Sequence, residues 1–428
     1  MAAWIIVALL VLVLAAVHVA AVLGLLSMGL DEMYMGGRLS RAMGEFIWDK
    51  QKEFLLIAIP MFILMGEIIL RAGIARKMYE AVAGWLSWLP GGLMHANIVS
   101  CSIFAATSGS SVATAATIGT VAYPEIEQRS YNESLFLGSI AAGGTLGILI
   151  PPSINLILYG FITDTSVPEL FMAGILPGLA LSGLFVVIIL IACLLRPDWG
   201  GEQPTVSWSE RLWSLVDLVP PMFLIIGVMG SIYGGIATPT EAASVGVVMA
   251  LVLAAWTRTL SIQMLLGAFE GTMRTTAMIM LIILAAVFLN FILGFIGVTQ
   301  ELILYIDELG WTPLQTMIAL VIFYLILGMF METLSMMLTT VPVVFPLVVG
   351  MGYDPVWFGI LVIVLMETAL ITPPIGVNLY VVHGIRQRGG KFNDVARGAL
   401  PFVLMMIAMV VLLIAFPQMA LYLPQLVY

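Results

Sequence analysis

Charged residues are scarce in this sequence. Only 10% of its 428 residues are Asp, Glu, Lys or Arg, whereas 61% are hydrophobic and the mean hydropathy is +1.11. A soluble domain carries roughly 25% charged residues, so the composition predicts an integral membrane protein in a lipid bilayer. The apolar runs predict spans near 4–27, 54–70, 133–160, 170–195, 216–233, 241–257, 276–297, 357–384 and 396–418.

Other absences narrow the function. The net charge is −9 and there is no basic run, which argues against binding of nucleic acid. The sequence has no Walker A motif, no His/Cys metal-ligand spacing and no nucleophile–base motif, so we expect no enzyme, no catalytic residue and no cofactor. Cys101 and Cys193 lie in apolar segments and are predicted to be core residues rather than a disulfide. Residues 1–4 include no basic residue, so we expect a retained first helix and not a cleaved signal.

Two parts of the chain, about 222 residues apart, are alike. The segment 149–153 reads LIPPS and is echoed by 371–375, which reads ITPPI; upstream, 111–124 aligns with 333–346 at the same offset. A duplicated unit with Pro-broken apolar segments is typical of secondary transporters, whose binding site lies where the two halves meet.

Loop charges predict that one copy is inverted relative to the other. The basic residues Arg71, Arg76 and Lys77 precede the polar tract of the first copy, whereas the matching stretch of the second copy is acidic. After the Pro-Pro span the first copy carries Asp164 and Glu169, and the second copy is basic. Inverting one copy places these basic loops in the cytoplasm, with the N-terminus cytoplasmic and the C-terminus periplasmic.

This topology requires two tracts to enter and leave the membrane on the same side. The predicted fold is an all-α polytopic membrane protein with an inverted structural repeat, two re-entrant hairpins and two Pro-Pro-broken helices. Its predicted parts are a first helix and loop at 1–53, a first repeat at 54–195 (hairpin 93–123, broken helix 133–160), a connecting loop and scaffold helices at 196–257, and a second repeat at 258–428 (hairpin 316–346, broken helix 357–384).

The first hairpin has a polar turn at 106–111. Non-helical backbone at membrane depth persists only where protein or a water-filled cavity covers it. The adjacent glycines at 143–147 precede Pro151 and Pro152, and each proline disrupts helical bonding and frees carbonyl groups. Neutral oxygens without a compulsory carboxylate suit Na⁺ better than a divalent ion. The alternative is that the Gly and Ser residues only permit close helix packing.

The second copy adds carboxylates to the same arrangement. Its hairpin turns near 328–335, which includes Glu332, and its broken span includes Glu367. A carboxylate inside a membrane is costly and marks a functional candidate. Either residue could line an ion site, carry a proton or accept hydrogen bonds from the hairpin; the plainer alternative is that it pins the hairpin. Half-helices whose N-terminal ends face the cavity would attract an anionic substrate.

Several segments resemble a known family. They lie at 58–67, 108–113, 146–154, 170–178, 233–243 and 372–380. Together they resemble the large permease subunit of TRAP (tripartite ATP-independent periplasmic) transporters, in the C4-dicarboxylate permease family, and the likeness runs from about Leu55 to Pro401. The resemblance implies an elevator-type, ion-transporter-like fold in the bacterial inner membrane, driven by a Na⁺ gradient. It also implies a separate small four-helix membrane subunit and a periplasmic binding protein that delivers an organic acid.

By resemblance, sodium would sit at each hairpin tip, against the facing broken helix. The implied sodium ligands are Ser108, Gly109, Ser111, Gly144 and Gly147 at one tip, and Gly328, Thr333, Thr368 and Thr372 at the other. The expected substrate cavity is lined by Thr107, Ser110, Pro151, Pro152, Glu332, Glu367, Pro373 and Pro374.

The expected motion is a slide of the hairpins and Pro-Pro spans against a scaffold that includes 4–27, 170–195 and 216–257. One rival is a stand-alone ion-coupled carrier of the same architecture that needs no binding protein. Another is a membrane-embedded enzyme that uses Glu332 and Glu367 as an acid–base or metal pair.

Overall fold

The computed structural model describes residues 11–12, 17–202, 206–386 and 389–427, and all of their regular structure is helical. Residues 4–10 and 13–16 of the predicted span 4–27, and the N-terminal residues 1–4, lie outside the described residues. The first described helix of that region, α2 (Val19–Met35), is preceded by His18 as its N-cap.

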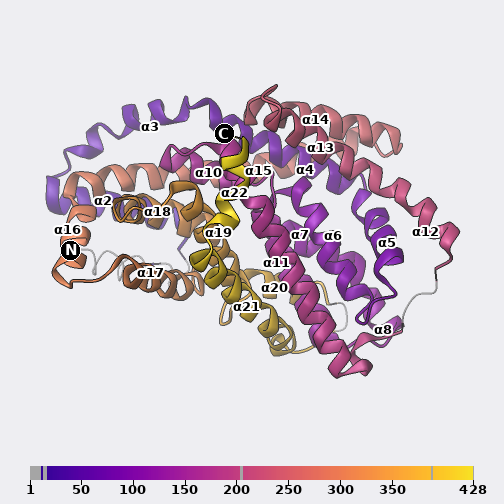
Figure 1. Cartoon of the computed structure of the whole chain (residues 1–428). Coiled ribbons are helices and arrows are strands. Elements are labelled where there is room, and N and C mark those ends of the chain that lie inside the picture. Colours follow the sequence, from indigo (N-terminus) through magenta and orange to yellow (C-terminus); the bar gives the residue numbers. More distant parts are fainter. Residues whose placement is uncertain (1–10, 13–16, 203–205, 387–388, 428) are drawn as a thin grey trace.

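The described helices form two groups (Figure 1). The peripheral layer consists of α2, α3 (Met43–Gln51), α4 (Ala58–Arg71), α13 (Val219–Tyr233), α14 (Pro239–Trp256) and α15 (Ile262–Ile296), along the upper side of Figure 1. The hairpin bundle consists of α5 (Ile74–Leu86), α6 (Leu93–Ser108), α7 (Ser111–Ala122), α9 (Glu133–Leu149), α10 (Ile154–Thr163), α11 (Val167–Leu195), α17 (Pro313–Gly328), α18 (Thr333–Gly350), α19 (Pro355–Leu370), α20 (Val377–Gly384), α21 (Phe392–Ala415) and α22 (Gln418–Val427). Short connectors are α8 (Pro124–Gln128), α12 (Trp208–Ser214), α16 (Val298–Glu308) and the 3-10 turns Leu39–Arg41, Phe54–Ile57, Pro197–Gly200 and Leu215–Leu218.

Among the described residues, seven helical segments are long and apolar enough to cross a membrane, or eight if α9 and α10, which are bent by 41°, form one span. They include the predicted spans near 54–70, 170–195, 216–233, 241–257 and 396–418. The predicted span 357–384 is divided into α19 and α20 by the irregular residues 371–376. α18 is long enough to cross, whereas α6, α17 and α19 are shorter apolar helices.

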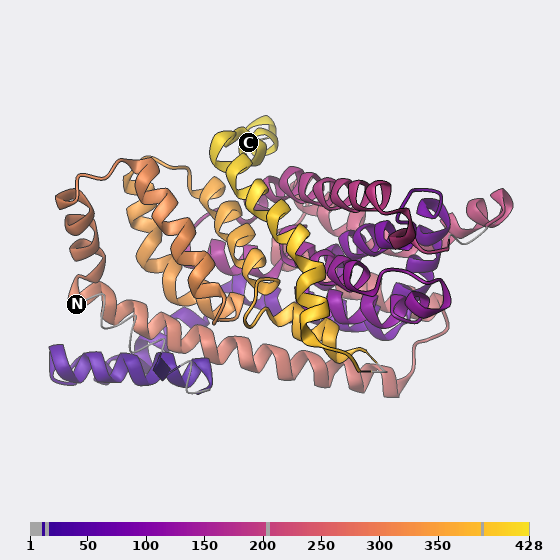
Figure 2. The ribbon, with the colours of Figure 1, turned by 90° about the horizontal axis from the view of Figure 1, so that it is seen from below.

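α15 extends well beyond the predicted span 276–297. It has 35 residues, which at 1.5 Å per residue gives about 52 Å, against a hydrocarbon core of roughly 30 Å. Figure 2 shows it crossing most of the molecule beside α2 and α3. A helix of this length must tilt strongly or continue past the hydrocarbon region.

One expectation about the peripheral parts was wrong. The sequence predicted a loop up to residue 53, but α3 forms there, where Phe46 packs against Phe291 of α15 with ring centroids 4.3 Å apart. The segment 170–195 is expected in the scaffold, and in the structure α11 packs against α9, α19, α21 and α22 of the hairpin bundle. Gly174 and Gly178 allow this approach, because Gly174 lies against the backbone of Leu149 and Gly178 against Ile150.

Helix breaks occur at four related places. α6 gives way to α7 at Gly109 and Ser110, and α17 gives way to α18 at residues 329–332. α9 and α10 are separated by residues 150–153, which include Pro151-Pro152, and α19 and α20 are separated by residues 371–376, which include Pro373-Pro374; both Pro-Pro peptide bonds are cis. The restart of each helix is set by local chemistry: Ser110, Ser153 and Glu332 are N-caps that accept a hydrogen bond from the backbone N–H three residues later.

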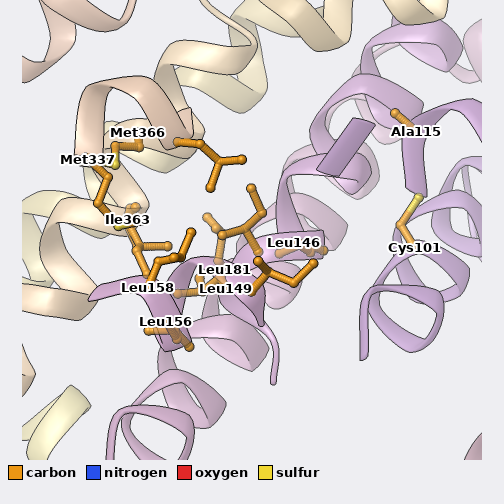
Figure 3. Packing of buried hydrophobic residues seen from close by; sticks show 14 of the residues in the cluster. Cys101, Ala115, Leu146, Leu149, Leu156, Leu158, Leu181, Met337, Ile363 and Met366 are labelled. Carbon is orange, nitrogen blue, oxygen red and sulfur yellow. The ribbon is translucent and has the colours of Figure 1, made fainter. Parts of the chain in front are cut away.

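The core of the hairpin bundle lies between the two halves of the chain. Leu146, Leu149 and Leu158 of α9 and α10 face Met337, Ile363 and Met366 of α18 and α19 (Figure 3). Polar contacts cross the same boundary, since the Tyr159 hydroxyl donates to the Pro355 carbonyl at 2.7 Å. This packing holds both hairpins and both broken helices in one body.

Candidate functional site

A single cavity of about 750 Å³ receives both hairpin tips. Its lining includes Ser108 to Ala113 from the first tip and Phe330 to Ser335 from the second. Asn155, Leu370, Ile375 and Val377 contribute from beside the helix breaks, and α4 and α15 of the peripheral layer close the remaining wall. The cavity therefore lies where segments from both halves of the chain meet each other and the peripheral layer.

The first tip is a compact set of hydroxyls. Gly109 has φ +60°, which is the left-handed region that glycine adopts without strain, and it lets α6 end. The hydroxyls of Ser108 and Thr114 lie 2.8 Å apart, and Thr114 also donates to the Ser110 carbonyl at 2.8 Å. Ser110 accepts from the N–H of Ala113 and so caps α7. Hydroxyl and carbonyl oxygens are thus concentrated at the tip.

Two glycines of α9 form a cradle for this tip. A methyl group on Gly147 would lie 2.8 Å from the Ser110 carbonyl oxygen and 2.9 Å from the Ser111 nitrogen. One on Gly144 would lie 3.1 Å from the Ser111 carbonyl oxygen and 3.0 Å from Asn378 Nδ2. Only a residue without a side chain fits at these positions, so the backbone of the tip lies directly on α9.

Ser111 also joins the two halves of the chain. Its hydroxyl donates to Oε2 of Glu367, on α19, at 2.8 Å. Both residues are buried, each with 1% of its surface exposed. A second link is made by Asn378 of α20, whose Nδ2 donates to the Ala141 carbonyl at 3.3 Å. The first tip is therefore held by groups that are far away in the sequence.

The second tip is organised around Glu332. Its carboxylate caps α18 and accepts hydrogen bonds from both the N–H and the hydroxyl of Ser335, at 3.4 and 3.1 Å. This places a negative charge at the positive end of α18, which is favourable. Thr333 is buried beside it, and Gly328 packs against the side chain of Ala369.

The structure brings most of the sodium ligands implied by resemblance close to a tip. Ser108, Gly109 and Ser111 line the cavity, and Gly144 and Gly147 lie directly behind them. At the other tip Thr333 lines the cavity, whereas the hydroxyls of Thr368 and Thr372 donate to carbonyls of their own chain, Val364 and Thr368.

Only some of the residues expected in the substrate cavity line it. Ser110 and Glu332 line it. Thr107 donates to the Phe104 carbonyl inside α6, and Glu367 accepts from Ser111. Pro151 is buried beside α11, and Pro152 is buried beside Gly109. Pro373 is partly exposed and Pro374 is exposed, so the break in the second repeat is open where the break in the first is covered.

Five polar lining residues were not predicted as part of the site. They are His18, Glu67, Asn155, Thr275 and Ser335. Glu67 pairs with Arg71 one turn later on α4 at 3.1 Å, and a methyl group on Gly271 of α15 would lie 2.7 Å from its carboxylate. Its charge within the apolar run of α4 was the available signal. Asn155 follows directly after the Pro-Pro break, and an amide inside such an apolar run was the corresponding signal.

The charge of the cavity is acidic. Among the described lining residues, Glu67 and Glu332 are carboxylates, and none is Lys or Arg. Arg71 neutralises Glu67, and the α18 N-terminus offsets Glu332. Within the described ranges there is also no group of three or more His, Cys, Asp or Glu side chains that could hold a transition metal.

Comparisons with known proteins agree with this arrangement. Residues 6–419 match the family model described as "Tripartite ATP-independent periplasmic transporter, DctM component". The C4-dicarboxylate TRAP transporter large permease protein DctM of Pseudomonas aeruginosa is 33% identical over 385 residues, which is 90% of this chain and 89% of the relative. The ectoine/5-hydroxyectoine TRAP transporter large permease protein UehC of Ruegeria pomeroyi is 34% identical over 376 residues, 87% and 86% of the two chains.

One solved structure shows the same fold at low identity. The crystal structure of the Alcanivorax borkumensis YdaH transporter superposes with a TM-score of 0.54 and 14% identity, covering 85% of this chain and 87% of that one. The family match spans nearly the whole chain, and the helical membrane architecture agrees with it. The chain therefore belongs to the DctM family, the large permease component of TRAP transporters.

Proposed function

We propose that this chain is the permease through which a sodium-driven TRAP system imports an organic acid, a dicarboxylate or another carboxylate. The observation that carries the proposal is the cavity of about 750 Å³ that both hairpin tips share with the peripheral layer. Cavities bounded by broken helices of two repeats are the binding sites of secondary transporters. The chain acts by moving a solute and not by making or breaking its bonds.

The hairpin tips recognise the transported solute. The N-terminal end of α7 points its cap at the cavity, and the Ser108 and Ser110 hydroxyls lie there as hydrogen-bond donors for a carboxylate. The two relatives named above are named after different solutes, although their sequence identities to this chain are nearly equal. Overall sequence likeness therefore does not select the cargo, and we assign only the carboxylate class.

Sodium is the proposed coupling ion, and the residues present fit it. The first tip offers hydroxyl and carbonyl oxygens around Ser108 and Ser111, and Gly144 and Gly147 let its backbone lie directly on α9. Thr333, Thr368 and Thr372 offer comparable oxygens at the second tip. A bound cation there would add positive charge next to an anionic cargo.

An elevator motion is proposed from the two helical groups. α2, α4, α14 and α15 pack on one another, and both hairpins and both broken helices pack together in the hairpin bundle. The two groups are in contact, and at one of these contacts a methyl group on Gly66 of α4 would lie 3.2 Å from Ser108 Cα. A small residue at that contact suits surfaces that slide past each other.

The proposed assembly is a separate small four-helix membrane subunit and a periplasmic binding protein, working with this chain in the bacterial inner membrane. The loop charges favour an N-terminus in the cytoplasm and a C-terminus in the periplasm. The inverted repeat, with hairpins entering from opposite faces, is the arrangement that supports alternating access in this proposal.

Reconstitution tests the proposal directly. Proteoliposomes that contain this chain and its small subunit, supplied with the binding protein, should accumulate a radiolabelled carboxylate when external Na⁺ exceeds internal Na⁺. Replacing Na⁺ by K⁺ or omitting the binding protein should each abolish accumulation. Uptake that persists without the binding protein would favour a stand-alone carrier, and uptake that ignores Na⁺ would refute the coupling.

A further inference from the structure

Glu367 is the least satisfied charged group in the hairpin bundle. It lies on α19 with 1% of its surface exposed. Oε2 accepts the Ser111 hydroxyl, but Oε1 has no hydrogen-bond partner in the described part of the chain. None of the ion pairs among the described residues involves Glu367. A buried carboxylate with a free oxygen is costly, so the position calls for a positively charged partner.

The charged side chains of the neighbouring helices cannot supply that partner. α7, α9, α10, α17 and α18 contain no Lys, Arg or His. On α21 the basic residue Arg397 lies near the first turn, and on α20 His383 lies near the last. Glu367 instead lies in the last turn of α19, just before the break.

The free oxygen belongs to the first tip and not to the substrate cavity. Ser111, which holds Oε2, has its backbone against Gly144 and Gly147. The same residue thus joins the cradle of the first tip to a carboxylate from the second repeat. The cavity lining includes Ser111, whereas Glu367 lies behind it.

The duplication allows Glu367 to be compared with the matching position of the first repeat. At the repeat offset of about 222 residues, Ser111 corresponds to Thr333 and Glu367 to Thr145. The Thr145 hydroxyl donates to the Ala142 carbonyl at 2.6 Å, so the first repeat has a neutral, satisfied group at this position. The carboxylate is therefore not required by the shared fold. It is specific to the tip where hairpin one meets the second repeat.

We propose that Glu367 is a ligand of the coupling cation at the first hairpin tip, binding Na⁺ through Oε1 together with oxygens of the tip. The site is then built from both repeats, and it is complete only when the first hairpin is seated on α19. This inference rests on the proposed sodium coupling. It adds a carboxylate to a site for which the neutral residues alone were expected.

Equilibrium binding of ²²Na⁺ to the purified complex tests the assignment without any transport assay. Glu367→Gln keeps the size of the side chain and removes its charge. We expect this variant to bind one Na⁺ fewer than wild type, or to bind it at least tenfold more weakly, which is about 1.4 kcal/mol. Glu270→Gln, at a carboxylate with 74% of its side chain exposed, is the matched control and should bind as wild type does.

A second variant separates a ligand from a structural tie. Glu367→Ala removes both the charge and the acceptor of the Ser111 hydroxyl, whereas Glu367→Gln keeps an amide oxygen that can accept the same hydrogen bond. We expect both variants to lose the same Na⁺, because both lack the charge. If only Glu367→Ala loses it and Glu367→Gln binds Na⁺ as wild type does, the Ser111–Glu367 bond positions the tip and Glu367 is not a ligand.

The native protein provides a check that does not depend on folding of a variant. A hydrophobic carbodiimide modifies carboxyl groups in membrane segments, and mass spectrometry locates the adduct. Na⁺, but not K⁺, should protect Glu367 from modification. Labelling that Na⁺ leaves unchanged, or Glu367→Gln protein with wild-type Na⁺ binding, would overturn the inference alone. Wild-type protein that binds no Na⁺ would instead overturn the proposed sodium coupling.

Discussion

The contact between Gly147 and the first hairpin tip allows one prediction to be worked through in detail. A methyl group at position 147 would lie 2.8 Å from the Ser110 carbonyl oxygen and 2.9 Å from both the Ser110 carbonyl carbon and the Ser111 nitrogen. All three are backbone atoms, which cannot rotate away as a flexible side chain can. Ordinary contact begins near 3.4 Å, so Gly147→Ala must move the tip by about 0.6 Å.

The expected result follows from this displacement. Overpacking of this kind lowers the free energy of unfolding by about 1–3 kcal/mol, whereas alanine stabilises a helix by up to about 1 kcal/mol relative to glycine. Stability should therefore fall only modestly. Transport should fall much more, because a misplacement approaching 1 Å in a site can reduce its activity about 100-fold. We expect at least a tenfold lower initial rate of carboxylate uptake, with the Na⁺ dependence weakened.

The assay is initial-rate uptake into proteoliposomes, with the melting temperature of the purified protein measured in parallel. Gly183→Ala is the matched control, because this helical glycine of α11 has no atom within 4 Å of the added methyl group. It should transport and melt as wild type does or slightly better. If Gly147→Ala protein imports at the wild-type rate, the tip does not need its present contact with α9, and the site assignment is wrong.

Further predictions concern stability. Arg386→Met should cost about 1–3 kcal/mol, because a side chain that is 3% exposed loses its hydrogen bonds to Glu133 and to the Lys391 carbonyl, whereas the Glu133 carboxylate, 43% exposed, stays partly solvated; Arg274→Met, whose ion pair is exposed, should change the melting temperature little. Thr238→Val should cost about 0.5–2 kcal/mol, because it removes the capping box of α14. Trp357→Phe should cost about 1–3 kcal/mol, because its indole N–H donates to a buried backbone carbonyl of α21 at 2.8 Å. Thermal unfolding in detergent measures all four, and a destabilised Arg274→Met with an unaffected Arg386→Met would contradict the burial argument.

Much of the backbone plan follows from local chemistry and was predictable. Proline removes a donor and glycine admits left-handed backbone, so the breaks at Pro151-Pro152 and Gly109 could be placed from the sequence alone. The pairing of Glu67 with Arg71 is equally local, because residues four apart lie on one face of a helix. Amphipathic segments were harder to predict: α3 mixes apolar with charged residues, and its contact with α15 stabilises it in the tertiary structure.

The sequence by itself determined that this is a membrane transporter of a recognisable family, because hydropathy, prolines and motifs are local properties of the chain. The tertiary structure decided which oxygens share a site. Ser111 and Glu367 are 256 positions apart, and neither residue carries a signal that names the other. Such a pairing depends on how two broken helices and a hairpin pack, and packing is set by the whole core at once. For that reason Glu367 could be recognised as important from its sequence context, but its place at the first tip could not.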